Sequence, residues 1–423
     1  MKVLIIGSGG REHALVWKLR QSPRVKQVYC VPGNGGIGAE AECLPADVKN
    51  MSSLLDLAGR IKPDLTVVGP ELPLTLGVVD AFNERGWKTF GPTKAAAQLE
   101  SSKSFAKEFM QRHNIPTAPY AICLSTDEVR DALPHFHMPI VLKADGLAAG
   151  KGVVICKTKD EVMAVAAEML SGKLLGEAGL RVVIEEYLQG EELSFLVFSD
   201  GERVAPLAAA QDHKRIGEGD TGPNTGGMGA FSTSAMIDEQ MQNWLLQHVA
   251  RPVVAGMKAE GMEYRGVLYC GLMVTAKGPM VLEFNCRFGD PETQAILMRL
   301  ESDLLEAMEA SIDGRVSDGD FRWSSDATVC VVMASGGYPG TFEAGKRISG
   351  LEEAGKLDGV KVFHAGTSKR DGAYFTSGGR VLGVTARAAD LKTAVERAYR
   401  AASCIKFENA YYRKDIAARG LKK

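Results

Sequence analysis

Short apolar runs alternate with amphipathic segments along the first hundred residues. Residues 2–7, 27–33 and 65–70 each contain a continuous apolar run, which is typical of strands buried on both faces of a parallel sheet. Residues 10–22 and 76–86 are predicted as helices, the second ending at its glycine. This order predicts an open parallel α/β sheet, and ligands of such sheets bind at the carboxyl ends of the strands.

The central part of the chain predicts longer strands and glycine-rich loops. We expect helices at residues 99–113 and 159–170, two strands joined by a glycine-rich loop within 138–157, a strand at 181–188, and a hairpin within 264–288 that turns at 277–279. Residues 217–229 are dense in glycine and are expected to lack regular structure.

The last hundred residues show a third pattern. Separate strands are predicted at residues 327–334, 360–366 and 380–388, followed by an amphipathic helix at 390–405. The sequence therefore predicts an α/β and α+β multidomain protein that ends in a small α+β domain.

Composition narrows the class of protein. The chain has 423 residues, which suggests two to four domains, and its 50 Lys and Arg against 52 Asp and Glu give a net charge of −2. A nucleic-acid binder usually has a basic excess, so no nucleic acid is expected as a partner. The eight cysteines are scattered without a Cys-x-x-Cys pair, which argues against a zinc site or a disulfide framework. With no apolar run long enough for a signal peptide or a membrane span, we expect a cytoplasmic protein with no membrane partner.

The glycine turn at residues 7–13 predicts an anion site. It follows a strand and opens a helix, where free backbone N–H groups favour negative charge. A dinucleotide fingerprint would need glycine in place of Glu12 and an acidic residue near positions 31–33, and the chain has neither. Arg11 suits a phosphate monoester, although a tight turn with a surface arginine is the alternative.

The second glycine-rich loop, residues 143–152, differs from a P-loop. Only three residues separate Gly146 from Gly150, Gly152 replaces the expected Ser or Thr, and a strand follows. A small-residue loop between two strands is typical of a lid whose N–H groups reach phosphate oxygens, and Lys143 would hold phosphate charge. A long hairpin with solvated lysines is the alternative.

Two further segments carry polar groups in strands. After the strand at 182–188, an acidic turn would suit adenine and ribose binding, but acidic turns are common. Residues 281–290 are more specific, because Glu283 and Asn285 share one face of a strand and Arg287 comes next on it, while Leu282, Phe284 and Cys286 are expected in a core. Two adjacent oxygen ligands suit Mg²⁺. A half-exposed edge strand is the alternative.

These motifs together resemble a known group of enzymes. The order of phosphate lid, Glu-Glu-Tyr-Leu hinge and Glu-x-Asn-x-Arg strand resembles the ATP-grasp superfamily. Within it, the chain resembles the glycinamide ribonucleotide synthetase (phosphoribosylamine–glycine ligase) family along essentially its whole length. The specific stretches are residues 7–15, 32–36, 69–80, 143–154, 211–230 and 287–293.

The resemblance implies three units. They are an N-terminal substrate domain for phosphoribosylamine at residues 1–102, an ATP-grasp domain at 103–325 with a lid subdomain at about 120–190, and a C-terminal domain at 326–423. It also implies a reaction of de novo purine biosynthesis, in which ATP phosphorylates glycine and 5-phosphoribosylamine attacks the glycyl phosphate. The products are glycinamide ribonucleotide, ADP and phosphate.

The resemblance assigns roles by position. Arg287, Lys143, Asp212 and Asp290 are implied as catalytic, and Glu283 and Asn285 as ligands of Mg²⁺ or Mn²⁺. ATP contacts are implied for Lys103, Lys143, Gly146, Gly150, Gly152, Glu185, Glu186, Leu188 and Glu192. Substrate contacts are implied for Gly10, Arg11, Asn34, Glu71, Lys214, Asn224, Thr225 and Gly226. Glycine, 5-phosphoribosylamine and ATP are the expected small-molecule partners of a monomer or weak dimer.

The chain departs from the superfamily pattern at one position, and two alternative functions are weighed against the family resemblance. Many superfamily members carry another acidic metal ligand on the neighbouring strand, but residues 269–273 contain no carboxylate. Another ATP-grasp ligase, such as a biotin-dependent carboxylase, is disfavoured by the glycine turn at 7–13 and the loop at 211–230. A nucleotide-binding regulatory module without turnover is disfavoured by Arg287 beside the metal ligands.

Overall fold

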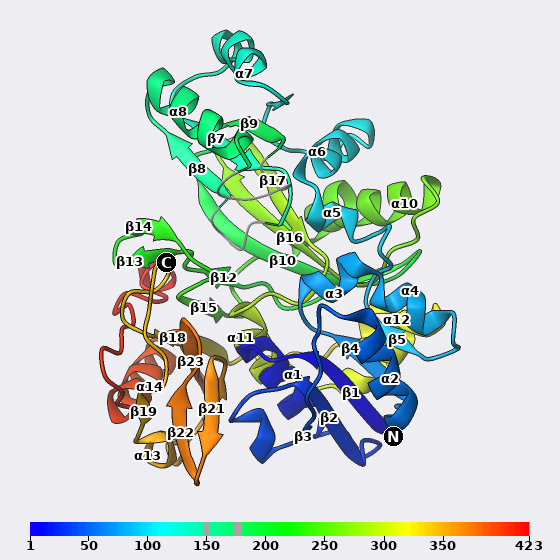
Figure 1. Cartoon of the computed structure of the whole chain (residues 1–423), viewed down its shortest axis with the longest axis vertical. Coiled ribbons are helices and arrows are strands. Elements are labelled where there is room, and N and C mark those ends of the chain that lie inside the picture. The colour runs from blue at the N-terminus through cyan, green and yellow to red at the C-terminus, as the bar shows by residue number, and fades with distance from the viewer. Residues whose placement is uncertain (148–151, 173–179, 423) are drawn as a thin grey trace.

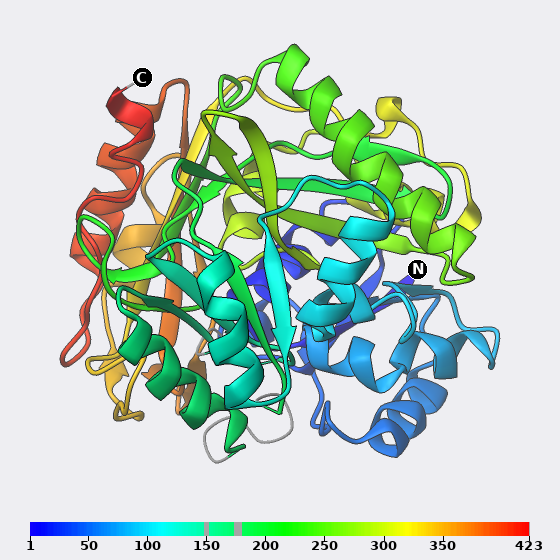
Figure 2. The same cartoon turned by 90° about the horizontal axis from the view of Figure 1, so that it is seen from above.

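The computed structural model describes residues 1–147, 152–172 and 180–422 and forms four packed units (Figure 1). Gly150 therefore lies outside the described residues. A small lid unit lies at one end of the long axis, above a central sheet. The N-terminal and C-terminal units lie on opposite sides below it, and Figure 2 shows the same arrangement from above.

The N-terminal unit is the predicted parallel sheet. Its strands run in the order β3-β2-β1-β4-β5, and every pair is parallel. Residues 3–6 of β1 are fully buried or nearly so, as the continuous apolar run predicted. The elements are β1 (Lys2–Gly7), α1 (Gly10–Leu19), β2 (Gln27–Pro32), β3 (Glu42–Cys43), α2 (Met51–Ile61), β4 (Leu65–Val68), α3 (Glu71–Leu76), α4 (Val78–Asn83) and β5 (Thr89–Phe90).

Two predicted helices are interrupted. The helix expected at 76–86 is wrong at its start, because Gly77 has a positive φ of 89° and separates α3 from α4. The helix expected at 99–113 is broken at Ser102, which is extended and whose side chain accepts a hydrogen bond from the Phe105 N–H as the N-cap of α6. The two pieces are α5 (Gln98–Ser101) and α6 (Lys103–Arg112).

The lid unit is an antiparallel sheet, in the order β6-β9-β7-β8, which packs with the helices of its described residues around its own apolar core. The predicted helix at 159–170 is confirmed. The elements are β6 (Tyr120–Cys123), α7 (Thr126–Ala132), β7 (Ile140–Ala144), β8 (Val153–Cys156), α8 (Lys159–Leu170) and β9 (Val182–Glu186).

The central sheet has the antiparallel order β11-β10-β16-β17. The predicted hairpin is present, but its turn lies at residues 276–277, one residue earlier than expected, because Gly278 already pairs with Thr275. The elements are β10 (Glu191–Asp200), β11 (Val204–Pro206), α9 (Glu239–Leu245), α10 (Arg251–Ala259), β16 (Arg265–Thr275), β17 (Gly278–Asn285), α11 (Glu292–Arg299) and α12 (Leu304–Asp313).

The C-terminal sheet has the order β12-β15-β18-β23-β20 and therefore takes two strands from earlier in the chain. The expectation that residues 217–229 lack regular structure is wrong, since β14 pairs with β13 there. The elements are β12 (Gln211–Asp212), β13 (Arg215–Gly217), β14 (Thr221–Asn224), β15 (Gly229–Ser232), β18 (Ala327–Ala334), β19 (Arg347–Ile348), α13 (Leu351–Gly355), β20 (Val360–His364), β21 (Thr367–Arg370), β22 (Ala373–Thr376), β23 (Arg380–Ala388) and α14 (Leu391–Cys404).

Within the three described ranges, no helix combines the length and the apolar character that crossing a membrane requires.

Candidate active site

A cavity of about 760 Å³ lies where the four units meet. Its lining includes Lys143 from the lid, Glu283 from the central sheet, Arg11 from the N-terminal unit and Arg380 from the C-terminal unit. The lining also contains most of the predicted site residues. They are Arg11, Glu71, Lys103, Lys143, Gly152, Glu185, Glu186, Leu188, Glu192, Asp212, Lys214, Asn224, Thr225, Gly226, Glu283, Asn285, Arg287 and Asp290.

At the lid end of the cavity, two lysines share one buried carboxylate. The Lys143 ammonium lies 2.9 Å from Glu185 Oε1, and the Lys107 ammonium lies 2.8 Å from Glu185 Oε2. Lys143 also donates to the Leu282 carbonyl at 2.8 Å, and Lys103 donates to the Gly146 carbonyl at 3.0 Å. Burial lowers the pKa of Lys107 to about 8 although the charge of Glu185 opposes the shift. The group thus carries an excess of positive charge, which suits polyphosphate.

Glu186 lines the cavity, and its carboxylate points to a partner in the lid unit. The Glu186 carboxylate accepts hydrogen bonds from the backbone and the ring of His137, both at 3.0 Å, so its side chain is engaged there. Leu188 lines the cavity beside it. Gly146 lies outside the described lining and contacts the site through the hydrogen bond from Lys103.

The proposed metal ligands lie next to a lysine. Lys214 Nζ lies 3.4 Å from Glu283 Oε1 and 3.2 Å from Glu192 Oε2. Burial opposes ionisation of Glu283, but the charges of Lys214, Lys143 and Lys103 outweigh it and lower its pKa to about 2. Asn285 Oδ1 accepts a hydrogen bond from Arg287 at 3.2 Å.

Two oxygen donors on one strand fit a magnesium ion that takes its other ligands from phosphate and water. Across the part of the chain that the structure describes, no group of three or more His, Cys, Asp and Glu side chains is arranged to hold a metal by itself. The neighbouring strand offers Gly271 opposite Glu283, as the sequence indicated. The donor set on this strand is therefore one carboxylate and one amide oxygen, Glu283 and Asn285.

The expected core position of Leu282 is wrong, whereas those of Phe284 and Cys286 are confirmed. The last two are 2% and 1% exposed. The pairing of β16 and β17 is irregular between Gly271 and Leu272, so Leu282 has no partner there and its side chain lines the cavity. A bulge of this kind reverses the inward and outward alternation of a strand locally.

Arg287 is held between two carboxylates. Its guanidinium lies 2.8 Å from Glu100 Oε1 and 3.4 Å from Glu71 Oε2. Burial opposes the charge of Arg287, but these carboxylates keep its pKa above the ordinary value. Burial also raises the pKa of Glu100, although Arg287 opposes that shift. A fixed cation thus lies directly beyond the proposed metal ligands.

The glycine turn of the N-terminal unit brings Arg11 to the cavity. Arg11 Nε contacts Glu12 Oε1 at 2.6 Å, and Nη1 donates to the Phe288 carbonyl at 3.1 Å. Two other predicted residues of this unit lie outside the described lining. Gly10 packs against Gln294, and the Asn34 amide donates to the Ser8 and His364 carbonyls, both at 2.8 Å. Asn34 thus joins the N-terminal unit to the C-terminal unit.

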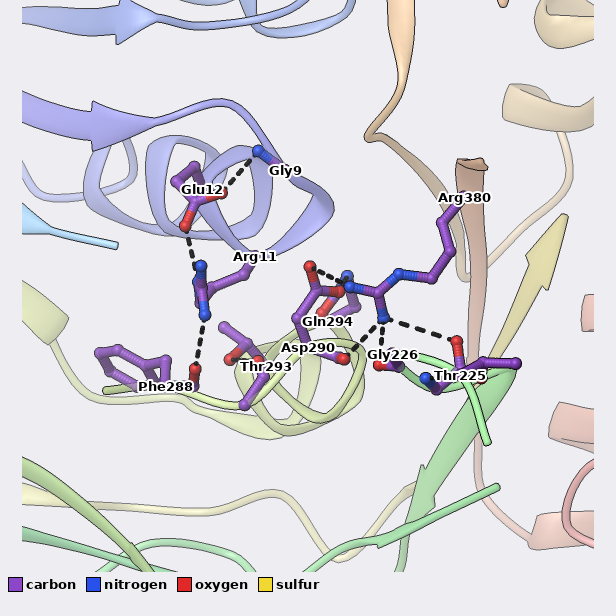
Figure 3. A network of polar contacts seen from close by, with 12 residues as sticks. Gly9, Arg11, Glu12, Thr225, Gly226, Phe288, Asp290, Thr293, Gln294 and Arg380 are labelled. Carbon is purple, nitrogen blue, oxygen red and sulfur yellow. Dashed lines mark hydrogen bonds and ion pairs between the residues drawn. The ribbon is translucent and has the colours of Figure 1, made fainter. Parts of the chain in front are cut away.

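Asp290 is held by a residue of the C-terminal unit (Figure 3). Arg380 Nη2 lies 3.1 Å from Asp290 Oδ2, and Nη1 donates to the Asp290 carbonyl at 2.7 Å. Gln294 donates to the other carboxylate oxygen at 2.8 Å. Burial opposes ionisation of Asp290, but Arg380 and then Arg11 keep its pKa below the usual range. Asp290 is therefore an ionised carboxylate facing the cavity.

The remaining polar wall surrounds Asp212. Burial raises the pKa of Asp212 although the charge of Lys214 opposes it. Glu292 Oε1 accepts hydrogen bonds from Ser194 at 3.0 Å and Tyr269 at 2.9 Å. The loop after β14 is tied to the same place, because the backbone and hydroxyl of Thr225 both donate to the Lys214 carbonyl.

Several residues that line the cavity were not predicted as site residues from the sequence. Lys107 follows Lys103 by four residues on a predicted helix. Residues four apart share one face of a helix, so this spacing was a signal by which Lys107 could have been predicted beside Lys103. Arg380 and Tyr338 are far along the chain from Asp290 and gave no local signal. Glu100, Lys107, Tyr269, Glu292, Tyr338 and Arg380 all line the cavity.

Comparison with known proteins agrees with this geometry. Residues 1–100, 101–293 and 328–419 match the N domain, the ATP-grasp (A) domain and the C domain of phosphoribosylglycinamide synthetase, respectively. The chain is 52% identical to a phosphoribosylamine–glycine ligase of Pseudomonas aeruginosa, over all of this chain and 98% of that protein. A ligase of the same name from Escherichia coli is 50% identical over all of this chain and 99% of its own length.

Solved structures give the same grouping. A phosphoribosylamine–glycine ligase of Thermotoga maritima superposes with a TM-score of 0.86 at 33% identity, covering 98% of this chain and all of that one. A biotin carboxylase of Campylobacter jejuni shares the fold alone, with a TM-score of 0.77 at 16% identity over all of this chain and 95% of its own. The three domains match in order, and the relatives near 50% identity cover the full length of the chain. These matches lead to one conclusion: the chain belongs to the phosphoribosylglycinamide synthetase family.

Proposed function

We propose that the protein is an ATP-dependent ligase of purine biosynthesis that joins glycine to 5-phosphoribosylamine through glycyl phosphate. The products are glycinamide ribonucleotide, ADP and phosphate. The observation that carries the proposal is the 52% identity to a phosphoribosylamine–glycine ligase along the full chain. The fixed charges around the cavity supply what such a reaction requires.

The first step needs charge neutralisation more than covalent chemistry. A carboxylate is a poor acyl donor until one of its oxygens becomes a phosphate leaving group, and phosphoryl transfer depends mainly on positioning and electrostatics. In our proposal Lys103 and Lys143 hold the ATP phosphates, and Arg287 faces the phosphoryl group. Lys107 also pairs with the Glu185 carboxylate. Lys143 can therefore turn toward phosphate while Glu185 keeps one cationic partner.

Glu283 and Asn285 would hold a divalent ion, which we propose to be Mg²⁺, with Mn²⁺ as a substitute. When bound, such an ion supplies positive charge that neutralises phosphate oxygens. Its support in this chain is the ionised Glu283 beside an amide oxygen on one face of β17.

The second step needs an amine held near the acyl phosphate. We assign Asp290 to accept a hydrogen bond from that amine, because it is ionised and lines the cavity. Arg11 and Glu71 would bind the phosphoribosyl group at the strand ends. Lys214 and residues 224–226 would line the pocket for glycine and 5-phosphoribosylamine. The proposed adenine contacts are Glu185, Glu186 and Leu188, with Glu192 at the ribose.

A coupled assay tests the proposal. ATP, Mg²⁺, glycine and freshly prepared 5-phosphoribosylamine are combined, and ADP release is followed with each component omitted in turn. We expect release only when all are present. ADP release that continues without glycine would refute the proposed reaction.

The molecular setting belongs to the same proposal. We expect a monomer or weak dimer in the cytoplasm, with small molecules as its substrates. All eight cysteines are free thiols, which suits a reducing compartment. Sedimentation of the purified protein tests the oligomeric state, and a stable tetramer would contradict it.

A further inference from the structure

Arg380 connects the C-terminal unit to two parts of the cavity wall. It is the first residue of β23, and one nitrogen, Nη1, donates to the carbonyls of Gly226 at 2.5 Å and Asp290 at 2.7 Å. Its other terminal nitrogen contacts the Asp290 carboxylate at 3.1 Å. One planar guanidinium therefore fixes a carboxylate and two carbonyl groups from separate segments, as Figure 3 shows.

Tyr338 holds the same loop through a second hydrogen bond. Its hydroxyl accepts a hydrogen bond from the Gly226 N–H at 3.0 Å, while Arg380 binds the Gly226 carbonyl. A Cβ added to Gly226 would lie 3.0 Å from Arg380 Cζ, so the guanidinium lies directly against the glycine backbone. Both polar groups of Gly226 are thus satisfied by the C-terminal unit.

Arg380 also provides the main positive charge for Asp290. Asp290 is ionised despite burial, chiefly through Arg380 and next through Arg11. The side chains at the lid end, Lys103, Lys143 and Glu185, come instead from α6, β7 and β9, which lie outside the C-terminal unit.

We propose that Arg380 is a positioning residue for the acceptor half of the reaction. By the acceptor substrates we mean glycine, which accepts the phosphoryl group, and 5-phosphoribosylamine, which accepts the glycyl group. Arg380 acts through Asp290 and the loop at residues 224–227. Use of the acceptor substrates therefore depends on the C-terminal unit, while ATP binding does not. This inference rests on the proposed function, because that proposal assigns Asp290 and the loop to the acceptor substrates.

The test compares Arg380→Gln, Arg380→Lys and the control Arg347→Gln, with each substrate varied separately. Arg347 is an exposed arginine on β19 of the same unit. A lost charge-assisted hydrogen bond at a buried site changes binding by roughly 10–100-fold. We therefore expect Arg380→Gln to raise KM for glycine or 5-phosphoribosylamine, or to lower kcat, by that amount. KM for ATP should stay within about twofold of the wild type.

Arg380→Lys keeps the charge but lacks the fork, so it should recover part of the loss. Calorimetric binding of ATP gives a readout separate from turnover and should be unchanged in all three variants. Equal weakening of ATP and acceptor use would overturn the proposal, because it would indicate a general structural role. So would Arg380→Gln kinetics equal to those of Arg347→Gln.

A second variant decides the case in which Arg380→Gln does not fold. Tyr338→Phe removes only the hydrogen bond from the Gly226 N–H and should produce the same acceptor-specific pattern on a smaller scale. Wild-type kinetics in Tyr338→Phe would then overturn the proposal. Failure of the proposed function itself would look different, because wild-type protein would then release ADP without the acceptor substrates.

Discussion

At the residue scale, the environment of Glu283 determines how the cavity handles negative charge. Its carboxylate lies among the ammonium groups of Lys214, Lys143 and Lys103, which outweigh the effect of burial and hold its pKa near 2. The group therefore stays ionised throughout the physiological range. A ligand of this kind contributes charge as well as an oxygen atom, and a neutral amide of the same shape would supply only the oxygen.

We predict that Glu283→Gln lowers kcat/KM by roughly 10²–10³, or about 3–4 kcal/mol of transition-state stabilisation. The amide removes the negative charge on the proposed metal but keeps the shape of the side chain. The rate is measured across a Mg²⁺ titration beside Glu239→Gln, an exposed residue of α9. Near-normal turnover of Glu283→Gln at low Mg²⁺ would exclude the metal-binding role.

Lys107→Met is expected to raise KM for ATP by roughly tenfold. Glu185 would keep Lys143 as its neighbouring cation, and moving Lys143 to phosphate would then leave a buried charge without a partner, which is costly. The exposed Lys277 on the β16–β17 turn provides the control, Lys277→Met. An unchanged KM for ATP in Lys107→Met would show that Glu185 does not restrain Lys143.

The residues that sequence reasoning found share a local cause. Glu283 and Asn285 alternate on β17 and Arg287 follows two residues after its end, so a period of two was enough to group them. The same period explains why Glu186 differs from Glu185: neighbours on β9 face opposite ways, and Glu186 contacts His137 instead of the lysines. Asn34 could not be judged from sequence, because its partner His364 lies on a distant strand.

At the element scale, the pairing of β16 with β17 sets the space around the proposed metal ligands. Gly271 lies opposite Glu283, and a Cβ there would lie 3.2 Å from Glu283 Cγ and 3.3 Å from Tyr269 Cε1. The Glu283 side chain therefore occupies space that a side chain at residue 271 would otherwise fill.

Gly271→Ala should raise the Mg²⁺ concentration for half-maximal activity roughly fivefold, since about 1 kcal/mol of overpacking would displace Glu283. Gly355→Ala is the matched control, because a Cβ there has open space. Both variants are compared by Mg²⁺ titration of the rate at saturating substrates. Identical titration curves would mean that the neighbouring strand does not constrain the ligand.

Most elements followed from local pattern, and the exceptions have distant partners. The helix at 159–170 has its N-cap, Thr158, and its apolar positions within one segment. The hairpin of β13 and β14 has no such local signal. It is held by the C-terminal segment, where Tyr411 donates to the Ile216 carbonyl and Arg413 to the Arg215 carbonyl. No periodicity around this hairpin could reveal contacts with partners 195 and 198 residues later in the chain.

At the scale of the whole molecule, buried histidines join the N-terminal and C-terminal units. The His364 N–H donates to His13 Nδ1 at 2.7 Å, and His13 Nε2 lies 3.2 Å from Glu40. Burial lowers the pKa of His13, and burial together with the charges of His13 and Lys361 lowers the pKa of His364 to about 3. Because the unfolded chain takes up a proton near pH 6.5 and the folded chain does not, stability falls as the pH drops below that value.

We predict that the free energy of unfolding decreases by about 1.4 kcal/mol per pH unit for His364 alone between about pH 6 and 4. His364→Phe should flatten that slope, whatever its effect on stability at pH 7.5. Denaturant unfolding at several pH values measures it, with the exposed His248→Gln as control. A slope that is the same in His364→Phe and wild type would mean that His364 is not the group responsible.

The shared sheet of the C-terminal unit has a consequence for how this protein can be divided. Strand β15 pairs with β18 through residues 229–232, and β12 pairs with β15 in turn. A fragment that begins at residue 326 would lack both strands and expose the edge of β18, which invites association with other chains. Any exchange of this unit between relatives must therefore carry two separate stretches of sequence. A single crossover point at residue 326 would pair strands from different proteins close to the loop at residues 224–227.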